Sequence, residues 1–121
     1  MSRKILIVED YEDTRQFMKI LFESYGYEVI EAADGLEAVE AIKQQFPDLI
    51  LMDISMPVMD GLTATRTIRT TDQGVQIPII AITAHGHRFY QQAIEAGCNE
   101  LIEKPVDFDS LESVLDKYLK E

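Results

Sequence analysis

The chain has 121 residues, of which 46% are hydrophobic and 27% are charged, a length and a balance typical of one globular domain with a sizeable core. Eleven Lys and Arg residues against 22 Asp and Glu residues give a formal net charge of −11, so we expect no direct binding to nucleic acid or to an anionic membrane surface. One cysteine cannot form an internal disulfide, and the N-terminal apolar run is too short for a signal peptide or a membrane span, so we expect a cytoplasmic protein. The length predicts one domain over residues 1–121.

Five short apolar runs alternate with amphipathic segments along the whole chain, a pattern typical of α/β proteins. The runs are Ile5–Val8, Tyr27–Ala32, Leu49–Met52, Ile79–Ile82 and Leu101–Ile102. Three of them are nearly continuous rather than alternating, as expected for parallel strands that are covered on both faces. We therefore predict a doubly wound, five-stranded parallel sheet with strand order 2-1-3-4-5 and helices on both faces, a (βα)5 arrangement.

The segments between the runs have the apolar spacing of helices. The residues expected to face the core are Phe17, Ile20 and Leu21 in the first helix, Leu36, Val39 and Ile42 in the second, and Leu111, Val114, Leu115, Tyr118 and Leu119 in the last. Asp109 with Glu112 resembles a capping box at the start of the last helix. Turns are expected at Tyr25-Gly26, Asp34-Gly35, Asp60-Gly61, Gln73-Gly74 and Ala96-Gly97.

Four of the five runs end in chemically reactive groups, and the carboxyl ends of parallel strands meet at one edge of a sheet. The groups at these ends are Glu9, Asp10, Asp53, Thr83 and Lys104. Three carboxylates held close together repel one another. Mg2+ resolves this conflict, because it binds one or two carboxylates and keeps waters and phosphate oxygens as its other ligands. The sequence therefore predicts an acidic Mg2+ site centred on the first and third strands.

Four motifs occur in order along the chain: Val8-Glu9-Asp10, Asp53-Ile54-Ser55-Met56-Pro57-Val58-Met59-Asp60-Gly61, Ile82-Thr83-Ala84 and Lys104-Pro105. On these motifs the chain, from about Lys4 to Leu119, resembles the response-regulator receiver domain, the CheY-like phosphoacceptor of two-component signalling. The length indicates the single-domain type. The resemblance implies a flavodoxin-like fold, which is consistent with the predicted strand order.

The resemblance also implies a role for each acid. Asp53 looks like the phosphoacceptor, which takes a phosphoryl group from a histidine kinase or a histidine phosphotransfer protein. Asp10 resembles a direct Mg2+ ligand. Glu9, in place of the commoner aspartate, resembles the acid that holds a water of the ion, and Ser55 would offer its backbone carbonyl to the metal.

Further residues would respond to the phosphoryl group. Thr83 resembles the hydroxyl that moves toward this group, Lys104 the cation that pairs with its oxygens, and Ala84 the small residue that leaves it room. The peptide bond before Pro105 would be cis, as in this family. Such a domain catalyses its own phosphorylation and dephosphorylation, and is a switch rather than a turnover enzyme.

The output face implied by the family comprises the fourth helix, the fifth strand and the fifth helix, which would bind a downstream protein target as a monomer or as a phosphorylation-dependent dimer. Many receivers carry Tyr or Phe at the position of Leu101. Ala93 and Ile94 suggest which side of the fourth helix meets the core. We interpret Tyr90 as a candidate to cover the output face near Leu101. His85, close to the acidic edge, is interpreted as a solvated loop residue.

Other functions remain open at this point. The chain is alternatively a receiver fragment of a hybrid kinase or of a larger regulator. A metal-dependent phosphohydrolase would need a general acid at the position of Ser55, and a flavin carrier would need a glycine-rich phosphate loop, whereas the turn over residues 9–13 is acidic. A receiver that never accepts phosphate is the remaining alternative.

Overall fold

The five apolar runs form one parallel sheet in the computed structural model, which describes residues 3–56, 59–72 and 74–119. Pro57 and Val58 of the long motif and Gln73 of one predicted turn lie outside the described residues. The strands are β1 (Lys4–Val8), β2 (Glu28–Ala32), β3 (Leu49–Asp53), β4 (Ile79–Thr83) and β5 (Glu100–Glu103). The helices are α1 (Glu12–Ser24), α2 (Gly35–Gln44), α3 (Gly61–Arg69), α4 (Gly86–Ala96) and α5 (Phe108–Leu119).

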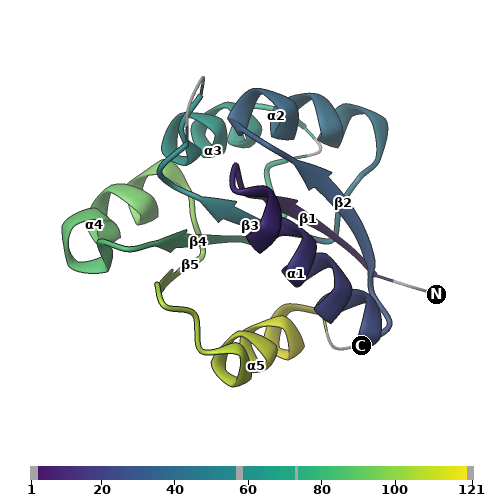
Figure 1. The fold of residues 1–121 in the computed structure, drawn as a ribbon. Coiled ribbons are helices and arrows are strands. Elements are labelled where there is room, and N and C mark those ends of the chain that lie inside the picture. Colours follow the sequence, from purple (N-terminus) through teal and green to yellow (C-terminus); the bar gives the residue numbers. More distant parts are fainter. Residues whose placement is uncertain (1–2, 57–58, 73, 120–121) are drawn as a thin grey trace.

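The strand order is β2-β1-β3-β4-β5, and every neighbouring pair is parallel, so the predicted topology is confirmed. Helices α1 and α5 cover one face of the sheet, and α2, α3 and α4 cover the other (Figure 1). Successive residues of β1 enter opposite core clusters: Ile5 and Ile7 pack with α1 and α5, whereas Leu6 and Val8 pack with the other three helices. Burial on both faces is why β1, β3 and β4 are almost continuously apolar.

The predicted core face of α1 is wrong in part. The side chains of Phe17 and Ile20 are 53% and 68% exposed, whereas Met18 and Phe22 are buried against the sheet. Helix α1 carries two apolar stripes one position apart, and periodicity alone does not say which of them meets the sheet. The outer stripe is not fully solvated, because the Phe17 ring packs edge-on against Phe108 of α5, with 5.2 Å between the ring centroids.

Two further expectations for helices need correction. Leu36 is exposed, and α2 buries Ala38, Val39 and Ile42. Helix α5 does not begin with the predicted box of Asp109 and Glu112, because its cap is the preceding acid, Asp107. Its carboxylate accepts a hydrogen bond from the Asp109 N–H at 3.0 Å and another from the Ser110 hydroxyl at 3.0 Å. The predicted apolar stripe of α5 is confirmed.

Two of the predicted turns are helix starts. The Asp34 side chain caps α2 by accepting from the Glu37 N–H at 2.8 Å, and the Asp60 side chain caps α3 by accepting from the Thr63 N–H at 2.8 Å. Helix α4 ends at Gly97, whose φ of 116° lies in the left-handed region of the backbone.

Within the described residues, no helix is both long and apolar enough to cross a membrane.

One side chain joins the loops at the edge of the sheet opposite the carboxyl ends. The Arg69 guanidinium donates hydrogen bonds to the carbonyl oxygens of Gly74, Ile77 and Gly97, at 2.6, 2.7 and 2.7 Å, and to the Asn99 side chain at 2.9 Å. The planar group with several N–H donors thus ties the end of α3 to the segments that enter β4 and β5.

We expect Arg69→Lys to lower the free energy of unfolding by about 2 kcal/mol, because a lysine keeps the charge but cannot satisfy four acceptors in this fork geometry. Chemical denaturation measures the effect. Arg66→Lys, at an exposed position of the same helix, is the matched control. Equal stabilities of the two variants would contradict this account of Arg69.

Candidate functional site

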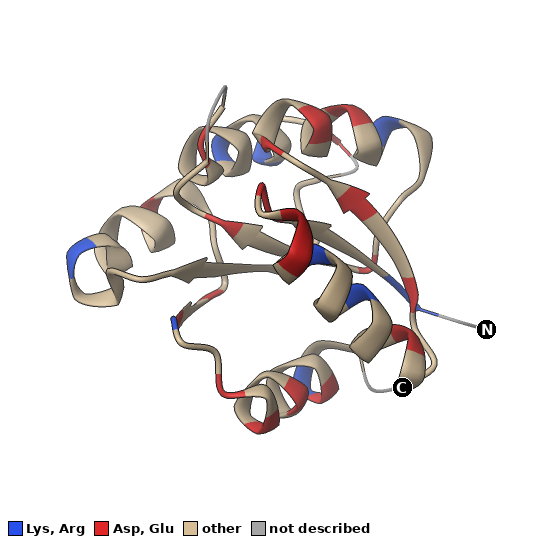
Figure 2. Ribbon diagram, in the orientation of Figure 1, with Lys and Arg blue, Asp and Glu red and all other residues tan. Residues whose placement is uncertain are grey.

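An open acidic pocket of about 360 Å³ lies at the carboxyl edge of the sheet, where the ends of β1, β3, β4 and β5 converge. Figure 2 shows acidic residues at the end of β3 and at the start of α1 close to one another. The residues that line the pocket are Glu9, Asp10, Tyr11, Thr14, Asp53, Ser55, Ala84, His85 and Lys104. Carboxylate oxygens of Glu9, Asp10 and Asp53 all lie within 4.8 Å of one another. The structure therefore brings the predicted acids together.

Asp53 is the last residue of β3 and is only 5% exposed. One carboxylate oxygen, Oδ1, accepts a hydrogen bond from the Ser55 N–H at 3.1 Å, and the other, Oδ2, lies 3.4 Å from Lys104 Nζ. Beyond Asp53 the chain stays attached to β4, because the Ile54 N–H donates to the Ile82 carbonyl at 3.0 Å. The carboxylate is thus held in one orientation from both sides.

Glu9 follows the last residue of β1 and is 3% exposed. Its carboxylate accepts from the Tyr11 N–H at 3.0 Å and lies 3.5 Å from Lys104 Nζ. Burial, together with the negative charge of Asp53, raises the pKa of Glu9 to about 7, although the Tyr11 N–H and the Lys104 charge act in the opposite direction. Asp10, by contrast, is exposed at the mouth of the pocket.

Lys104 is the cation of the pocket and follows directly after β5. Burial lowers the pKa of its ammonium group, but the charges of Asp53 and Glu9 outweigh burial and raise this pKa above the ordinary value. The Lys104 N–H donates to the Thr83 carbonyl at 2.8 Å, which fixes the residue beside the end of β4. The Lys104–Pro105 peptide bond is cis, as the resemblance implied.

Thr83 ends β4 as predicted, but its side chain is almost fully buried and does not line the pocket. Its hydroxyl oxygen accepts a hydrogen bond from the His85 N–H at 3.1 Å, so the hydroxyl is held against the turn that follows the strand. Ala84 and His85 form the wall of the pocket on this side.

The model of the response regulator receiver domain family matches residues 5–116. The chain belongs to this family. It is a receiver domain, a signalling switch of two-component systems.

Similar proteins agree with this assignment over nearly the whole chain. The polar-differentiation response regulator DivK of Brucella anthropi is 36% identical over 120 residues, which are 98% of each chain. The receiver domain of the sensor histidine kinase PA1611 of Pseudomonas aeruginosa PAO1, solved with a magnesium ion coordinated in its active site cleft, has a TM-score of 0.92 and 35% identity, with all of both chains covered.

A third similar structure is that of a complex. In it, the histidine phosphotransfer signalling protein Ypd1 of Saccharomyces cerevisiae is bound to the receiver domain of its downstream response regulator Ssk1. The match has a TM-score of 0.89 and 26% identity, and it covers 97% of the present chain and 88% of the other.

Two residues of the pocket were not singled out from the sequence. Tyr11 and Thr14 line the mouth, and Thr14 lies in the first turn of α1. The available signal was their position: Tyr11 directly follows Asp10, and Thr14 lies in the first turn of the helix that starts beside the end of β1. His85, interpreted as a loop residue, is exposed but also forms part of the pocket wall.

The predicted output residues of the receiver domain differ in how far they are buried. Leu101 is half-buried and packs against the core cluster on the side of α4, and Phe89 packs against the same cluster. Tyr90 is 57% exposed and Ile94, expected on the core side, is exposed as well. Residues four positions apart share a helix face. Tyr90 and Ile94 therefore form a solvent-facing apolar stripe on α4.

The donor set fits a hard divalent cation. It consists of carboxylate oxygens, which Mg2+ prefers, and two of the three acids are buried where their charges oppose each other. Burial first, and the charge of Asp53 second, raise the pKa of Glu9, so both disfavour the charged form of this acid. The geometry thus offers more negative charge than Lys104 neutralises.

Without metal, Glu9→Gln is expected to stabilise the fold more at high pH than at low pH. Because the pKa of Glu9 in the folded protein, about 7, exceeds its ordinary value of 4.5, wild-type stability falls as the pH rises from 4.5 through 7. The variant lacks this loss, and its advantage should grow by about 3 kcal/mol between pH 4.5 and pH 8.

Denaturation in the presence of EDTA at several pH values measures this advantage. Glu12→Gln, at an exposed position in the first turn of α1, is the control. An advantage that is the same at every pH would show that burial does not raise the pKa of Glu9.

Proposed function

We propose that this receiver domain accepts a phosphoryl group on Asp53 from the phosphohistidine of a histidine kinase or of a histidine phosphotransfer protein. The observation that carries the proposal is the buried Asp53 carboxylate, which lies among two further acids and 3.4 Å from the Lys104 ammonium. Mg2+ would be held by Asp10, Asp53 and the Ser55 backbone carbonyl, with Glu9 holding a water of the ion. The magnesium ion in the active site cleft of the PA1611 receiver domain supports this choice.

In the reaction, an Asp53 carboxylate oxygen forms a bond to phosphorus while the phosphorus–nitrogen bond of the donor histidine breaks. The electron pair of that bond stays on the ring nitrogen, and the product is an aspartyl phosphate. Phosphoryl transfer needs alignment and charge neutralisation more than a strong nucleophile. The Ser55 N–H and Lys104 hold the carboxylate in place. Bound Mg2+ supplies charge neutralisation at the phosphoryl oxygens.

Lys104 has a second task after transfer. Its ammonium group, whose raised pKa keeps it charged, pairs with a phosphoryl oxygen and offsets the added negative charge. Hydrolysis of the aspartyl phosphate by water then restores the carboxylate. The same residues thus promote phosphorylation and dephosphorylation, which makes the domain a switch that acts on itself.

Thr83 and Ala84 link this chemistry to a change of conformation. The Thr83 hydroxyl accepts a hydrogen bond from His85 but still has a proton to donate. A phosphoryl group on Asp53 places an acceptor oxygen near the Thr83 hydroxyl, where the free carboxylate has none. The hydroxyl and the turn after β4 therefore move toward the phosphoryl oxygen. Small Ala84 in the pocket wall leaves room for this group.

The output surface comprises α4, β5 and α5. Tyr90 and Ile94 present apolar area there. Leu101, half-buried against the core cluster, is the switching side chain in place of an aromatic ring. Exposed aromatic residues are enriched at protein interfaces. The downstream target is a protein, bound by a monomer or by a dimer that phosphorylation promotes, and the site of action is the cytoplasm. The Ypd1 complex with a similar receiver supports a phosphotransfer protein as the partner that exchanges phosphate.

A small phosphodonor such as acetyl phosphate should add one phosphoryl group to the protein in the presence of Mg2+. The adduct should be absent in EDTA and absent in Asp53→Asn, because the amide is no nucleophile for phosphorus. Intact-mass spectrometry measures both results, and circular dichroism confirms that the variant is folded.

The matched control is Asp34→Asn, which changes another carboxylate to an amide but keeps the helix cap of α2. This control should be phosphorylated like the wild type. An adduct of full stoichiometry on Asp53→Asn would assign the phosphoacceptor to a different residue.

A further inference from the structure

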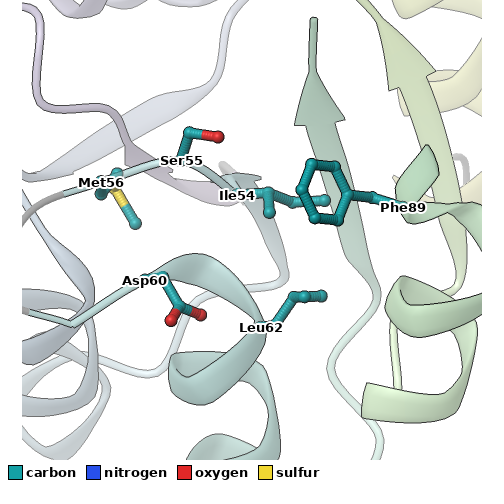
Figure 3. A pocket seen from close by; sticks show the side chains of 6 residues that line it. All are labelled: Ile54, Ser55, Met56, Asp60, Leu62 and Phe89. Atoms are coloured by element: carbon teal, nitrogen blue, oxygen red, sulfur yellow. The ribbon is translucent and has the colours of Figure 1, made fainter. Parts of the chain in front are cut away.

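A second cavity, of about 450 Å³, lies beside the acidic pocket, between α3 and α4. We call it the α3–α4 groove; its lining residues are Ile54, Ser55, Met56, Asp60, Leu62 and Phe89 (Figure 3). In Figure 3 the Phe89 ring points from α4 toward Ile54, and Leu62 lies beneath them. The groove shares Ser55 with the acidic pocket, so the two cavities are neighbours.

The walls of the groove are apolar and well supported. Ile54 and Leu62 are buried, and Met56 and Phe89 are half-buried against the same core cluster. Two neighbouring side chains also support the Phe89 ring. The His85 ring lies edge-on to it, with 6.3 Å between the ring centroids, and the Arg88 guanidinium lies 5.6 Å from the Phe89 centroid. A preformed apolar wall of this kind lowers the entropic cost of binding.

The groove is separate from the output surface. Phe89 and Tyr90 are adjacent residues of α4 and therefore point about 100° apart around the helix axis. Phe89 faces the groove and the core, whereas Tyr90 and Ile94 face solvent. Two partners are able to use these two sides of α4 independently.

Charge defines what fits the groove. Asp60 is exposed at the rim of the groove. Among the described residues its carboxylate accepts hydrogen bonds from Thr63, through the N–H at 2.8 Å and the hydroxyl at 3.3 Å, and a carboxylate has further acceptor sites for a cation. On the other side of Ser55 lie the three acids of the pocket. A positively charged group is attracted here, whereas a second copy of this chain, with its net charge of −11, is repelled.

The groove is open to solvent, which favours a protein segment over a metabolite. Small-molecule pockets bury most of the surface of their ligand, whereas this groove is an open cavity with Asp60 as the one charged residue among its described lining residues. Binding hot spots of proteins are rich in Trp, Tyr and Arg, that is, in large apolar side chains and cations. The volume of about 450 Å³ accepts such a side chain.

From these observations we propose that the α3–α4 groove docks a basic segment of a partner protein, which inserts one large apolar side chain between Ile54, Leu62 and Phe89 and places a Lys or Arg at Asp60. This interaction goes beyond the proposed phosphorylation and does not require it. It is therefore testable on the unphosphorylated protein in EDTA.

The probe is a random peptide library displayed on phage, selected against the immobilised full chain in EDTA. Peptides that bind should share an aromatic residue or leucine next to Lys or Arg. Their affinity, measured by isothermal titration with synthetic peptides, should fall about tenfold or more in Phe89→Ala and about threefold in Asp60→Asn, which removes the charge but keeps a helix cap.

Tyr90→Ala, one residue outside the groove, is the matched control and should bind as the wild type does. Methyl chemical shifts of Ile54 and Leu62 on addition of peptide to the wild-type protein supply a second measurement that does not depend on a variant folding. Selected peptides that are acidic, that bind Phe89→Ala with unchanged affinity, or that leave both methyl signals unmoved would overturn the proposal. Failure of phosphorylation on Asp53 affects none of these results.

Discussion

The gathering of three carboxylates, two of them beside one ammonium group, is the constraint on which the rest of this site depends. Lys104 lies 3.4 Å from Asp53 and 3.5 Å from Glu9, two acids that are almost completely removed from water. One positive charge cannot neutralise three negative ones, and burial makes the excess costly. The edge of the sheet is therefore poorly suited to stability and well suited to binding a divalent cation and a phosphoryl group, a balance that is common at functional sites.

The sheet makes this arrangement possible because it holds each group at a strand end. β1 and β3 are neighbours at the centre of the sheet, which sets Glu9 and Asp53 side by side, and the backbone hydrogen bond from Lys104 to Thr83 places the lysine beyond β4. Strands β1, β3 and β4 are buried on both faces and have little freedom to shift. Rigid strands thus carry the charges, while the turns that follow them remain free to respond.

Helix α4 connects the acidic pocket with two different surfaces. His85 lines the pocket, and its ring packs against Phe89, which forms a wall of the α3–α4 groove. Tyr90, the next residue, faces solvent on the other side of the helix. One helix thus borders the pocket at its start and carries two different surfaces on its sides.

The sequence by itself determined the topology and the acidic edge, because continuous apolar runs and the residues that end them are local signals. The stripe of α5 was equally clear. Tertiary structure alone decided which stripe of α1 is buried, since Phe17 and Met18 carry equally apolar spacing and only the sheet distinguishes Met18. It also decided that the Thr83 hydroxyl faces the His85 N–H and that Phe89 completes a groove with α3. Such contacts join segments far apart in the chain or depend on a single side-chain rotation, and no periodicity in the sequence records either.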